Sequence, residues 1–469
     1  MTLPGSTRAQ RWALTSLSLT MLMPSLDTSI ANAGLPTLAR AFGASFAHVQ
    51  WVVLAYLLAI TTLIVSAGRL GDLVGRRRLL LAGIALFTSA SLACGLATTL
   101  AALVAARALQ GLGAAAMLAL TVALVGETIP KEKTGSAMGL LGTMSAIGTT
   151  LGPSLGGVLM AGGDWRSIFL VNVPLGLVNL LLAHRFLPPS RAAAPDDRPR
   201  FDIAGTLLLA LSLAAYALAM TSHTPLLLAG AASGTLLFVL VEARSTAPLI
   251  RLAMFRDPAL VASLATSTLV ATVIMTTLVV GPFYLSRSLG LPAAVVGVVL
   301  SAGPLVSALT GAPAGRLVDR LGAPRMTFAG LVGMLVGASL LALAPPLGGI
   351  AGYVAPVLVM TAGYATFQAA NNTALMSNVG AQQRGVVSGM LSLSRNLGLI
   401  TGASAMGAVF AAASASADVA TAPPSAVAFG LRATFGVAAG LIVVALAVAA
   451  LARTLVRRRA NTAARQLPV

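Results

Sequence analysis

Two short charged segments carry the same pattern, and their first residues, Gly68 and Gly315, lie 247 positions apart. The first segment reads GRLGDLVG and the second reads GRLVDRLG, so glycine stands at both ends and aspartate at the same offset in each copy. Each segment connects two long apolar stretches. Self-similarity at a fixed spacing indicates an internally duplicated chain. The sequence therefore predicts two related halves, each with this segment between its second and third helices.

The surroundings of most of this chain are predicted to be lipid. Hydrophobic residues make up 57% of the sequence and charged residues 9%, whereas a soluble domain has roughly 25% charged residues. Apolar runs long enough to cross a bilayer, about 17–25 residues each, can be placed fourteen times along the chain. The expected fold class is therefore an all-α membrane protein with fourteen transmembrane helices.

The net charge of +18 could indicate nucleic-acid binding, but the positions of the charges argue against it. With both termini placed inside the cell, 24 of the 30 lysine and arginine residues fall in cytoplasmic loops. This asymmetry follows the positive-inside rule. The excess charge is thus explained as an orientation signal. The expected location is the cell inner (cytoplasmic) membrane, multi-pass, with both termini cytoplasmic.

The repeat and two charged, proline-containing stretches predict how the chain is divided, because such stretches form solvated linkers between membrane helices. The predicted parts are an N-terminal six-helix half (1–185), a cytoplasmic linker (186–202), two inserted transmembrane helices (203–241), a second linker (242–258), a C-terminal six-helix half (259–452) and a cytoplasmic tail (453–469). Two six-helix halves account for twelve transmembrane helices, and the inserted pair brings the predicted number to fourteen.

Asp27 is the one acidic residue of twelve that lies well inside an apolar run. Ionisable groups at that depth are costly and usually functional, which makes Asp27 the candidate proton carrier. Arg107 is its natural counter-charge, because a buried arginine needs a carboxylate, carbonyl groups or water. The structural alternatives are that Asp27 only accepts hydrogen bonds within the helix bundle and that Arg107 extends to the membrane interface.

The fifth apolar run contains the string GTTLGPSLGG at residues 148–157. Small residues at every fourth position give a helix a flat face for close packing, and proline removes a backbone hydrogen-bond donor. Helix packing alone could explain spaced glycines, but the full string is more specific than that. The residues that define it are Gly148, Gly152, Pro153, Gly156 and Gly157.

Aromatic and amide side chains within the apolar runs are candidates for substrate contact, because together they can bind a flat, partly polar compound. These candidates are Asn32, Trp51, Tyr56, Gln110, Tyr364, Gln368, Asn371 and Asn372. The alternatives are that Trp51 anchors the helix at the membrane interface and that the asparagines bridge helices. One cysteine and three scattered histidines give no metal site. No enzyme chemistry and no cofactor are expected.

The motifs together resemble the major facilitator superfamily, specifically its fourteen-helix drug:proton antiporter branch. The segment at 68–75 resembles the first signature of the superfamily, the string that begins at Arg107 its proton-coupling signature, and residues 148–157 its antiporter signature. Three further strings resemble that branch, at residues 26–36, 50–59 and 165–176. The match is dense through residue 176 and looser beyond it.

The resemblance implies a major facilitator fold of two six-helix halves plus two inserted helices. It implies a proton-coupled secondary active transporter, an efflux antiporter of small amphipathic compounds or drugs that works by alternating access. In that mechanism Asp27 carries the proton, Arg107 couples to it, and the repeated loops gate the cytoplasmic side. The gating residues implied are Gly68, Arg69, Asp72, Gly75, Arg76, Arg77, Gly315 and Asp319.

One departure bears on the substrate. Some multidrug members of that branch carry further carboxylates in their second half, whereas the ninth to fourteenth apolar runs here contain no buried acid. A neutral, anionic or zwitterionic substrate is thus expected at least as much as an organic cation. Two alternatives stay open: an uptake carrier for a specific metabolite such as a vitamin or sugar, and a transporter-like membrane sensor. The expected partners are a small-molecule substrate, protons and the lipid bilayer, with no nucleic acid; the sequence carries no signal for a periplasmic adaptor.

Overall fold

The computed structural model describes residues 6–128, 134–162, 164–189, 202–222, 224–245, 252–343, 345–377, 384–414 and 422–465. The regular secondary structure of these residues is helical, and they contain no β-strand. Helices suit an apolar environment because their backbone groups pair within one segment. Twelve of them are long and apolar enough to cross a membrane. The prediction of an all-α membrane protein is confirmed.

The helices fall into three consecutive sets. The N-terminal bundle consists of α1 (Ser6–Phe42), α2 (Phe46–Val49), α3 (Trp51–Val74), α4 (Arg76–Leu96), α5 (Leu100–Thr128), α6 (Thr134–Ala161), α7 (Ser167–Leu170) and α8 (Asn172–Phe186). The next pair is α9 (Ile203–Ser222) and α10 (Pro225–Arg244). The C-terminal bundle consists of η3 (Leu252–Arg256), α11 (Pro258–Phe283), η4 (Tyr284–Ser288), α12 (Ala293–Leu321), α13 (Ala323–Leu343), α14 (Pro345–Ser377), α15 (Arg384–Thr401), η5 (Gly402–Met406), α16 (Gly407–Ala413) and α17 (Pro424–Arg465).

Two long helices, α1 and α6, fall outside the set of twelve although they contain 37 and 28 residues. Helix α1 carries buried polar residues such as Ser16, Thr20 and Asp27, and α6 is rich in glycine, serine and threonine. Both helices pack inside the assembly, α1 against α6 and α8, and α6 against α12. A helix that faces protein tolerates polar residues that a lipid-facing helix does not. With these two, the described residues hold fourteen helical segments of membrane-crossing length, the predicted number.

The repeated loop segments end two helices in the same backbone conformation. Gly75 follows α3 with φ 101° and ψ 121°, and Gly322 follows α12 with φ 84° and ψ 143°. The amide of Gly75 donates to the carbonyl of Gly71 at 2.8 Å, and that of Gly322 to the carbonyl of Val318 at 2.9 Å. Glycine adopts a positive φ at little cost, so both copies close on glycine and the next helix begins one residue later.

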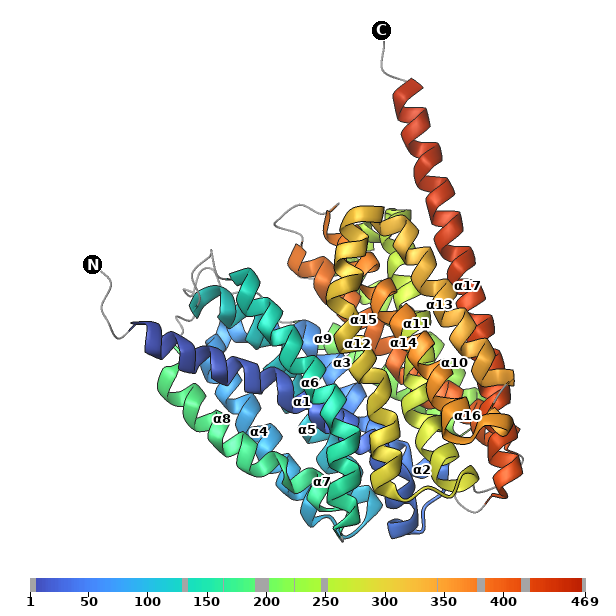
Figure 1. Cartoon of the computed structure of the whole chain (residues 1–469). Helices are drawn as coiled ribbons and strands as arrows, with labels where there is room; N and C mark the ends of the chain where they lie inside the picture. The colour runs from blue at the N-terminus through green and yellow to red at the C-terminus, as the bar shows by residue number, and fades with distance from the viewer. Residues whose placement is uncertain are drawn as a thin grey trace.

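The two bundles meet through direct contacts between helices of one bundle and helices of the other. Helix α3 of the N-terminal bundle packs against α15, α6 packs against α12, and α1 packs against α11. The second long helix of each bundle thus contacts the fifth long helix of the other, which is the same pairing in both directions. Figure 1 shows the two bundles side by side, with both chain ends on the same side and α2, α7 and α16 on the opposite side.

Helices α9 and α10 lie at the edge of the assembly. Helix α10 packs against α9, and α9 contacts α3 and η5. The Ser66 and Thr206 hydroxyl groups share a hydrogen bond of 2.9 Å, and the Tyr216 hydroxyl donates to Thr401 Oγ1 at 3.2 Å. Only 17% of the apolar window of α10 is buried, the smallest share among the twelve spans, so this helix is mostly exposed to the surroundings.

The predicted linkers lie only partly within the described residues, because 190–201 and 246–251 are outside them. The second linker ends where Asp257 caps α11, its side chain accepting from the amide of Ala259 at 2.9 Å. Helix α17 extends to Arg465 and projects past the other helices (Figure 1), so the predicted tail is helical where it is described.

Candidate functional site

A buried ion pair joins α1 to α5. Asp27 is 1% exposed and Arg107 is 0% exposed, and the Arg107 guanidinium donates to Asp27 Oδ2. Two amides complete the site: Gln110 Nε2 and Asn172 Nδ2 each donate to Asp27 Oδ1 at 2.8 Å. All three partners are donors, so the site is arranged around an ionised carboxylate. The structure brings together the two residues that the sequence singled out as deep charges.

Arg107 has further partners on α3. Its Nε donates to the carbonyl of Val52 at 2.9 Å, and its guanidinium carbon lies 4.2 Å from the centre of the Tyr56 ring. Arg107 Nη2 has no hydrogen-bond partner among the described residues. Helix α3 can approach this closely because a Cβ on Gly111 would lie 2.5 Å from the Tyr56 carbonyl oxygen. The glycine that follows the arginine thus places the tyrosine ring over the buried charge.

A cavity of about 370 Å³ lies between the two bundles. Helices α1, α3, α5, α6, α11, α12, α14 and α15 form its walls. Four of the predicted substrate residues line it: Asn32, Tyr56, Tyr364 and Gln368. Asn32 is buried, and neither side-chain heteroatom of its amide has a partner among the described residues. That amide is therefore available to a molecule in the cavity.

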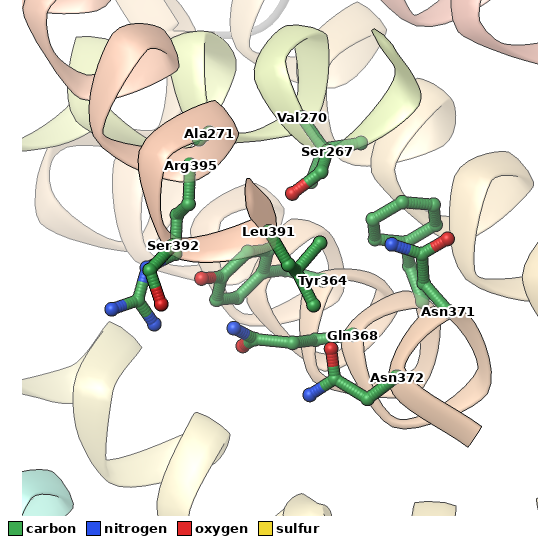
Figure 2. Close-up of a pocket in the computed structure, with 11 residues that line it drawn as sticks. Ser267, Val270, Ala271, Tyr364, Gln368, Asn371, Asn372, Leu391, Ser392 and Arg395 are labelled. Atoms are coloured by element: carbon green, nitrogen blue, oxygen red, sulfur yellow. The ribbon is translucent and has the colours of Figure 1, made fainter. Parts of the chain in front are cut away.

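A second cavity, of about 230 Å³, adjoins the first and shares Tyr364, Gln368 and Arg395 with it. Figure 2 shows these side chains together with Asn371 and Asn372, which line the second cavity only. The two cavities bring together four amide and aromatic residues of α14 that the sequence analysis had selected. Arg395, which lines both cavities, comes from α15.

The remaining two predicted substrate residues lie elsewhere. Trp51 is partly buried and packs against the main hydrophobic core. Gln110 is fully buried in the ion-pair network, where its amide also donates to Ser91 Oγ at 2.8 Å. The sequence analysis did not select Asn172 or Ser91 as site residues. A lone amide within an apolar run, as at Asn172, is the signal that could have found one of them.

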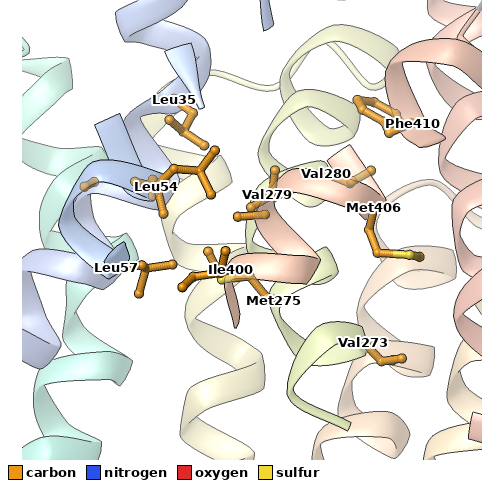
Figure 3. Packing of buried hydrophobic residues seen from close by; sticks show 14 of the residues in the cluster. Leu35, Leu54, Leu57, Val273, Met275, Val279, Val280, Ile400, Met406 and Phe410 are labelled. Atoms are coloured by element: carbon orange, nitrogen blue, oxygen red, sulfur yellow. The ribbon is translucent and has the colours of Figure 1, made fainter. Parts of the chain in front are cut away.

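On one side of the central cavity the bundles are closed by apolar packing. The Phe46 ring lies 4.7 Å from the Phe283 ring and 5.5 Å from the Phe410 ring, in edge-to-face arrangements. Aliphatic side chains from both bundles continue this layer (Figure 3), among them Leu35, Leu54, Leu57, Met275, Val279, Val280, Ile400 and Met406. We call this layer the seal. Its side chains come from α1, α2 and α3 of the N-terminal bundle and from α11, α15, η5 and α16 of the C-terminal bundle, and they pack into one hydrophobic cluster.

The glycines of the 148–157 string pack α6 against two helices. A Cβ on Gly148 would lie 2.6 Å from the carbonyl oxygen of Leu22 in α1, and Gly152 is in equally close contact with Ser29. A Cβ on Gly157 would lie 2.7 Å from the carbonyl oxygen of Ala293 in α12. The other residues of the string make similar contacts: Pro153 touches Gly297, and Gly156 lies against Ile30. The string therefore joins the N-terminal bundle to the C-terminal bundle.

The cavity lies on the side of the chain ends. Helix α6 begins on that side (Figure 1), and Gly142, near its beginning, lines the cavity. Pro153 and Gly157, which contact α12, come later in the same helix. The seal thus faces the opposite side of the molecule, where α2 and α16 lie in contact.

The predicted gating residues surround the two loop turns. The side chains of Arg69 and Asp72 lie outside the described residues. Arg77 donates to the carbonyl of His184, at the end of α8. Asp319 is exposed and forms no ion pair within the described part of the chain. Three further predicted gating residues lie within helices. Arg76 is the first residue of α4. Gly68 in α3 and Gly315 in α12 both have open space where a Cβ would stand.

Comparisons with known proteins agree with this architecture. Residues 17–403 match the family model of the Major Facilitator Superfamily. Multidrug resistance protein Stp of Mycobacterium tuberculosis (strain CDC 1551 / Oshkosh) is 34% identical over 421 residues, which cover 86% of this chain and 76% of Stp. Riboflavin transporter RibZ of Clostridioides difficile (strain 630) is 29% identical over 409 residues, covering 86% of this chain and 89% of RibZ.

A solved structure gives the same result for the fold. A bacterial homolog to the human lysosomal transporter Spinster, in an inward-facing and unoccupied conformation, has a TM-score of 0.71 at 16% identity and covers 97% of this chain and 99% of its own. The resemblance inferred from the motifs is confirmed. The chain belongs to the Major Facilitator Superfamily and is a multi-pass membrane transporter of small molecules.

Proposed function

We propose that this transporter exports small amphipathic compounds in exchange for protons, by alternating access. The observation that carries the proposal is the buried Asp27–Arg107 pair, which the Tyr56 side chain separates from the central cavity. Tyr56 lines that cavity and also packs against the Arg107 guanidinium. A titratable carboxylate so close to a substrate-sized space is what proton coupling requires.

The hydrogen bonds of Asp27 give protonation a structural consequence. The carboxylate accepts from Arg107, Gln110 and Asn172. Adding a proton removes the negative charge that balances Arg107 and turns one acceptor oxygen into a donor. At least one of the three donors then loses its acceptor, and unpaired buried donors are costly. Protonation therefore disfavours the present packing of α1 against α5, and release of the proton to the cytoplasm stabilises the cavity-open arrangement, in which substrate can bind.

We propose that the protein lies in the cell inner membrane with both termini in the cytoplasm. The excess of basic residues on the side of the termini supports this orientation. In it, the cavity faces the cytoplasm, and the conformation described here is the one that takes up substrate for export. The name of the relative Stp, a multidrug resistance protein, supports export. We also keep the division into two six-helix halves and an inserted pair, α9 and α10, as a proposal.

Substrate-induced proton movement tests the proposed function. Inside-out vesicles containing the protein would be energised to an acidic interior and loaded with a pH-sensitive dye. Addition of an exported compound should release protons from the vesicle interior, and vesicles without the protein should show no release. A compound that accumulates in these vesicles without proton release, and whose accumulation persists after the gradient is collapsed, would rule out coupling.

Uptake of a specific metabolite is the second candidate, and one observation favours it: the relative RibZ is a riboflavin transporter. Under this alternative the same carboxylate would drive substrate inward. The direction of gradient-driven accumulation separates the two. Export predicts accumulation in inside-out vesicles with an acidic interior. Uptake predicts accumulation in right-side-out vesicles with an acidic exterior.

A further inference from the structure

The wall shared by the two cavities carries an unpaired positive charge. Arg395 lines both cavities, is exposed within them, and forms no hydrogen bond or ion pair with any described residue. Arg107, which also lies deep inside a span, has a carboxylate, an amide oxygen and a backbone carbonyl as partners. The charge of Arg107 is thus balanced by a carboxylate, although its Nη2 has no hydrogen-bond partner among the described residues. Arg395 has been left free on the surface that meets the substrate.

The cavity around Arg395 contains no compensating acid. Among the described residues that line the two cavities there is no aspartate or glutamate, and Asp27 is not one of the lining residues. The field in the cavity is therefore set by the guanidinium. An organic cation would be repelled by this charge, whereas an anionic group would be attracted.

The neighbours of Arg395 are arranged for a polar group with an apolar body. In Figure 2 the Tyr364 hydroxyl, the Gln368 amide and the Ser392 hydroxyl lie on the same side of the cavity as the guanidinium. Another part of the lining of the larger cavity is apolar, with Ile274, Met275 and Leu278 from α11 and Ile60 and Ile64 from α3. A ligand that fits has a charged head near α14 and α15 and a hydrophobic part between α3 and α11.

We propose that Arg395 binds the carboxylate of an amphipathic organic anion or zwitterion, and that the transporter prefers such substrates to neutral and cationic analogues. This inference rests on the proposed function, since it names the substrate class of the same cavity. The guanidinium can donate two parallel hydrogen bonds to a carboxylate, which a lysine ammonium cannot reproduce. Gln368 and Tyr364 would supply further hydrogen bonds to the same group.

Three probes with one fluorophore test the preference. Dansyl-glycine carries a carboxylate, dansyl-glycinamide is its neutral analogue and dansyl-ethylenediamine carries an ammonium group. Binding to the purified full chain in a nonionic detergent would be measured by dansyl fluorescence. We expect the order carboxylate, amide, ammonium. A charge-assisted bond predicts that Arg395→Gln weakens dansyl-glycine binding about 10- to 100-fold and dansyl-glycinamide binding less than about threefold.

Two variants control for damage to the fold. Arg395→Lys keeps the charge and loses the paired geometry, so it should retain an intermediate preference for the carboxylate. Arg432→Gln removes an exposed arginine that contacts the carbonyl of Ala342, far from the cavity, and should bind all three probes like the unaltered protein. If Arg395→Gln keeps its affinity for dansyl-glycinamide, its cavity is intact.

The proposal is overturned if dansyl-glycine binds no more tightly than dansyl-glycinamide, including the case in which neither binds, or if Arg395→Gln keeps the preference. Competition with phosphatidylglycerol in mixed micelles tests the other source of an anionic group. Displacement of dansyl-glycine by that lipid at low mole fraction would assign Arg395 to lipid headgroups and overturn its role in substrate selection. Because these measurements use no proton gradient, they would still succeed if proton coupling failed.

Discussion

The guanidinium carbon of Arg107 lies 4.2 Å from the centre of the Tyr56 ring, and the same ring lines the central cavity. Neither Arg107 nor Asp27 is among the residues that line that cavity. Tyr56 thus stands where the contents of the cavity meet the buried ion pair. A substrate that moves this ring would alter the surroundings of both charges, which gives substrate binding and proton exchange a shared contact.

Removing the Tyr56 ring should uncouple proton movement from transport. In Tyr56→Ala the cavity would reach Arg107, and water could then reach Asp27. We expect a proton leak in proteoliposomes without substrate, measured with an internal pH-sensitive dye. Tyr56→Phe keeps the ring and loses only a long hydrogen bond of 3.3 Å to the Pro24 carbonyl, so its leak should stay at background. A tight membrane with Tyr56→Ala, at unchanged protein insertion, would contradict the barrier role.

Replacing the carboxylate should separate accumulation from exchange. Asp27→Asn lacks the charge and cannot carry a proton, so gradient-driven accumulation should be abolished. Substrate counterflow, which needs no gradient, should persist if the cavity is intact. Asp27→Glu should keep partial accumulation. Breaking a buried pair costs roughly 3–5 kcal/mol, so thermal unfolding in detergent must accompany the assay, and full accumulation by folded Asp27→Asn would end the coupling hypothesis.

A larger side chain at the contact between α6 and α12 should shift the equilibrium from the conformation with a closed seal toward one with an open seal. A Cβ in Gly157→Ala would meet the carbonyl oxygen of Ala293 at 2.7 Å. Overpacking of this kind costs roughly 1–3 kcal/mol, which corresponds to a change of about 5- to 150-fold in the equilibrium between the closed-seal and open-seal conformations. The readout is maleimide labelling from the outside at Val279→Cys, which is buried in the seal. Labelling should rise. Gly230→Ala, which meets nothing within 4 Å, is the matched control; equal labelling in both would refute the effect.

The two aspartates of the repeated loops should differ in importance. Asp319 is exposed and forms no ion pair with the described residues, so Asp319→Asn should change transport turnover by less than about twofold. Asp72→Asn is predicted to slow turnover more than it weakens substrate binding and to favour the outward-facing state. Initial transport rates and equilibrium binding, measured on the same preparations, check both. A larger loss of turnover for Asp319→Asn than for Asp72→Asn would reverse the assignment.

The sequence by itself determined the solvent, the repeat and the deep charges. Long apolar runs require lipid whatever their order in space, and glycine at positive φ is a local demand, so Gly75 and Gly322 could be matched from their flanking residues alone. Asp27 and Arg107 were recognisable because a charge within an apolar run is costly and needs a partner. The helix bounds were less accessible, since helices such as α1 and α17 continue beyond their apolar runs.

Only the tertiary structure decided which groups share a site. Asn172 reaches Asp27 from 145 positions away, and Gln110 faces the ion pair instead of the cavity, because helix rotation is set by packing against neighbouring helices. Gly157 could be recognised as a packing residue, but its contact with α12 of the other bundle could not. Arg395 acquired its significance in the same way. A free charge is defined by the absence of partners in space, and no pattern of neighbours along the chain records that.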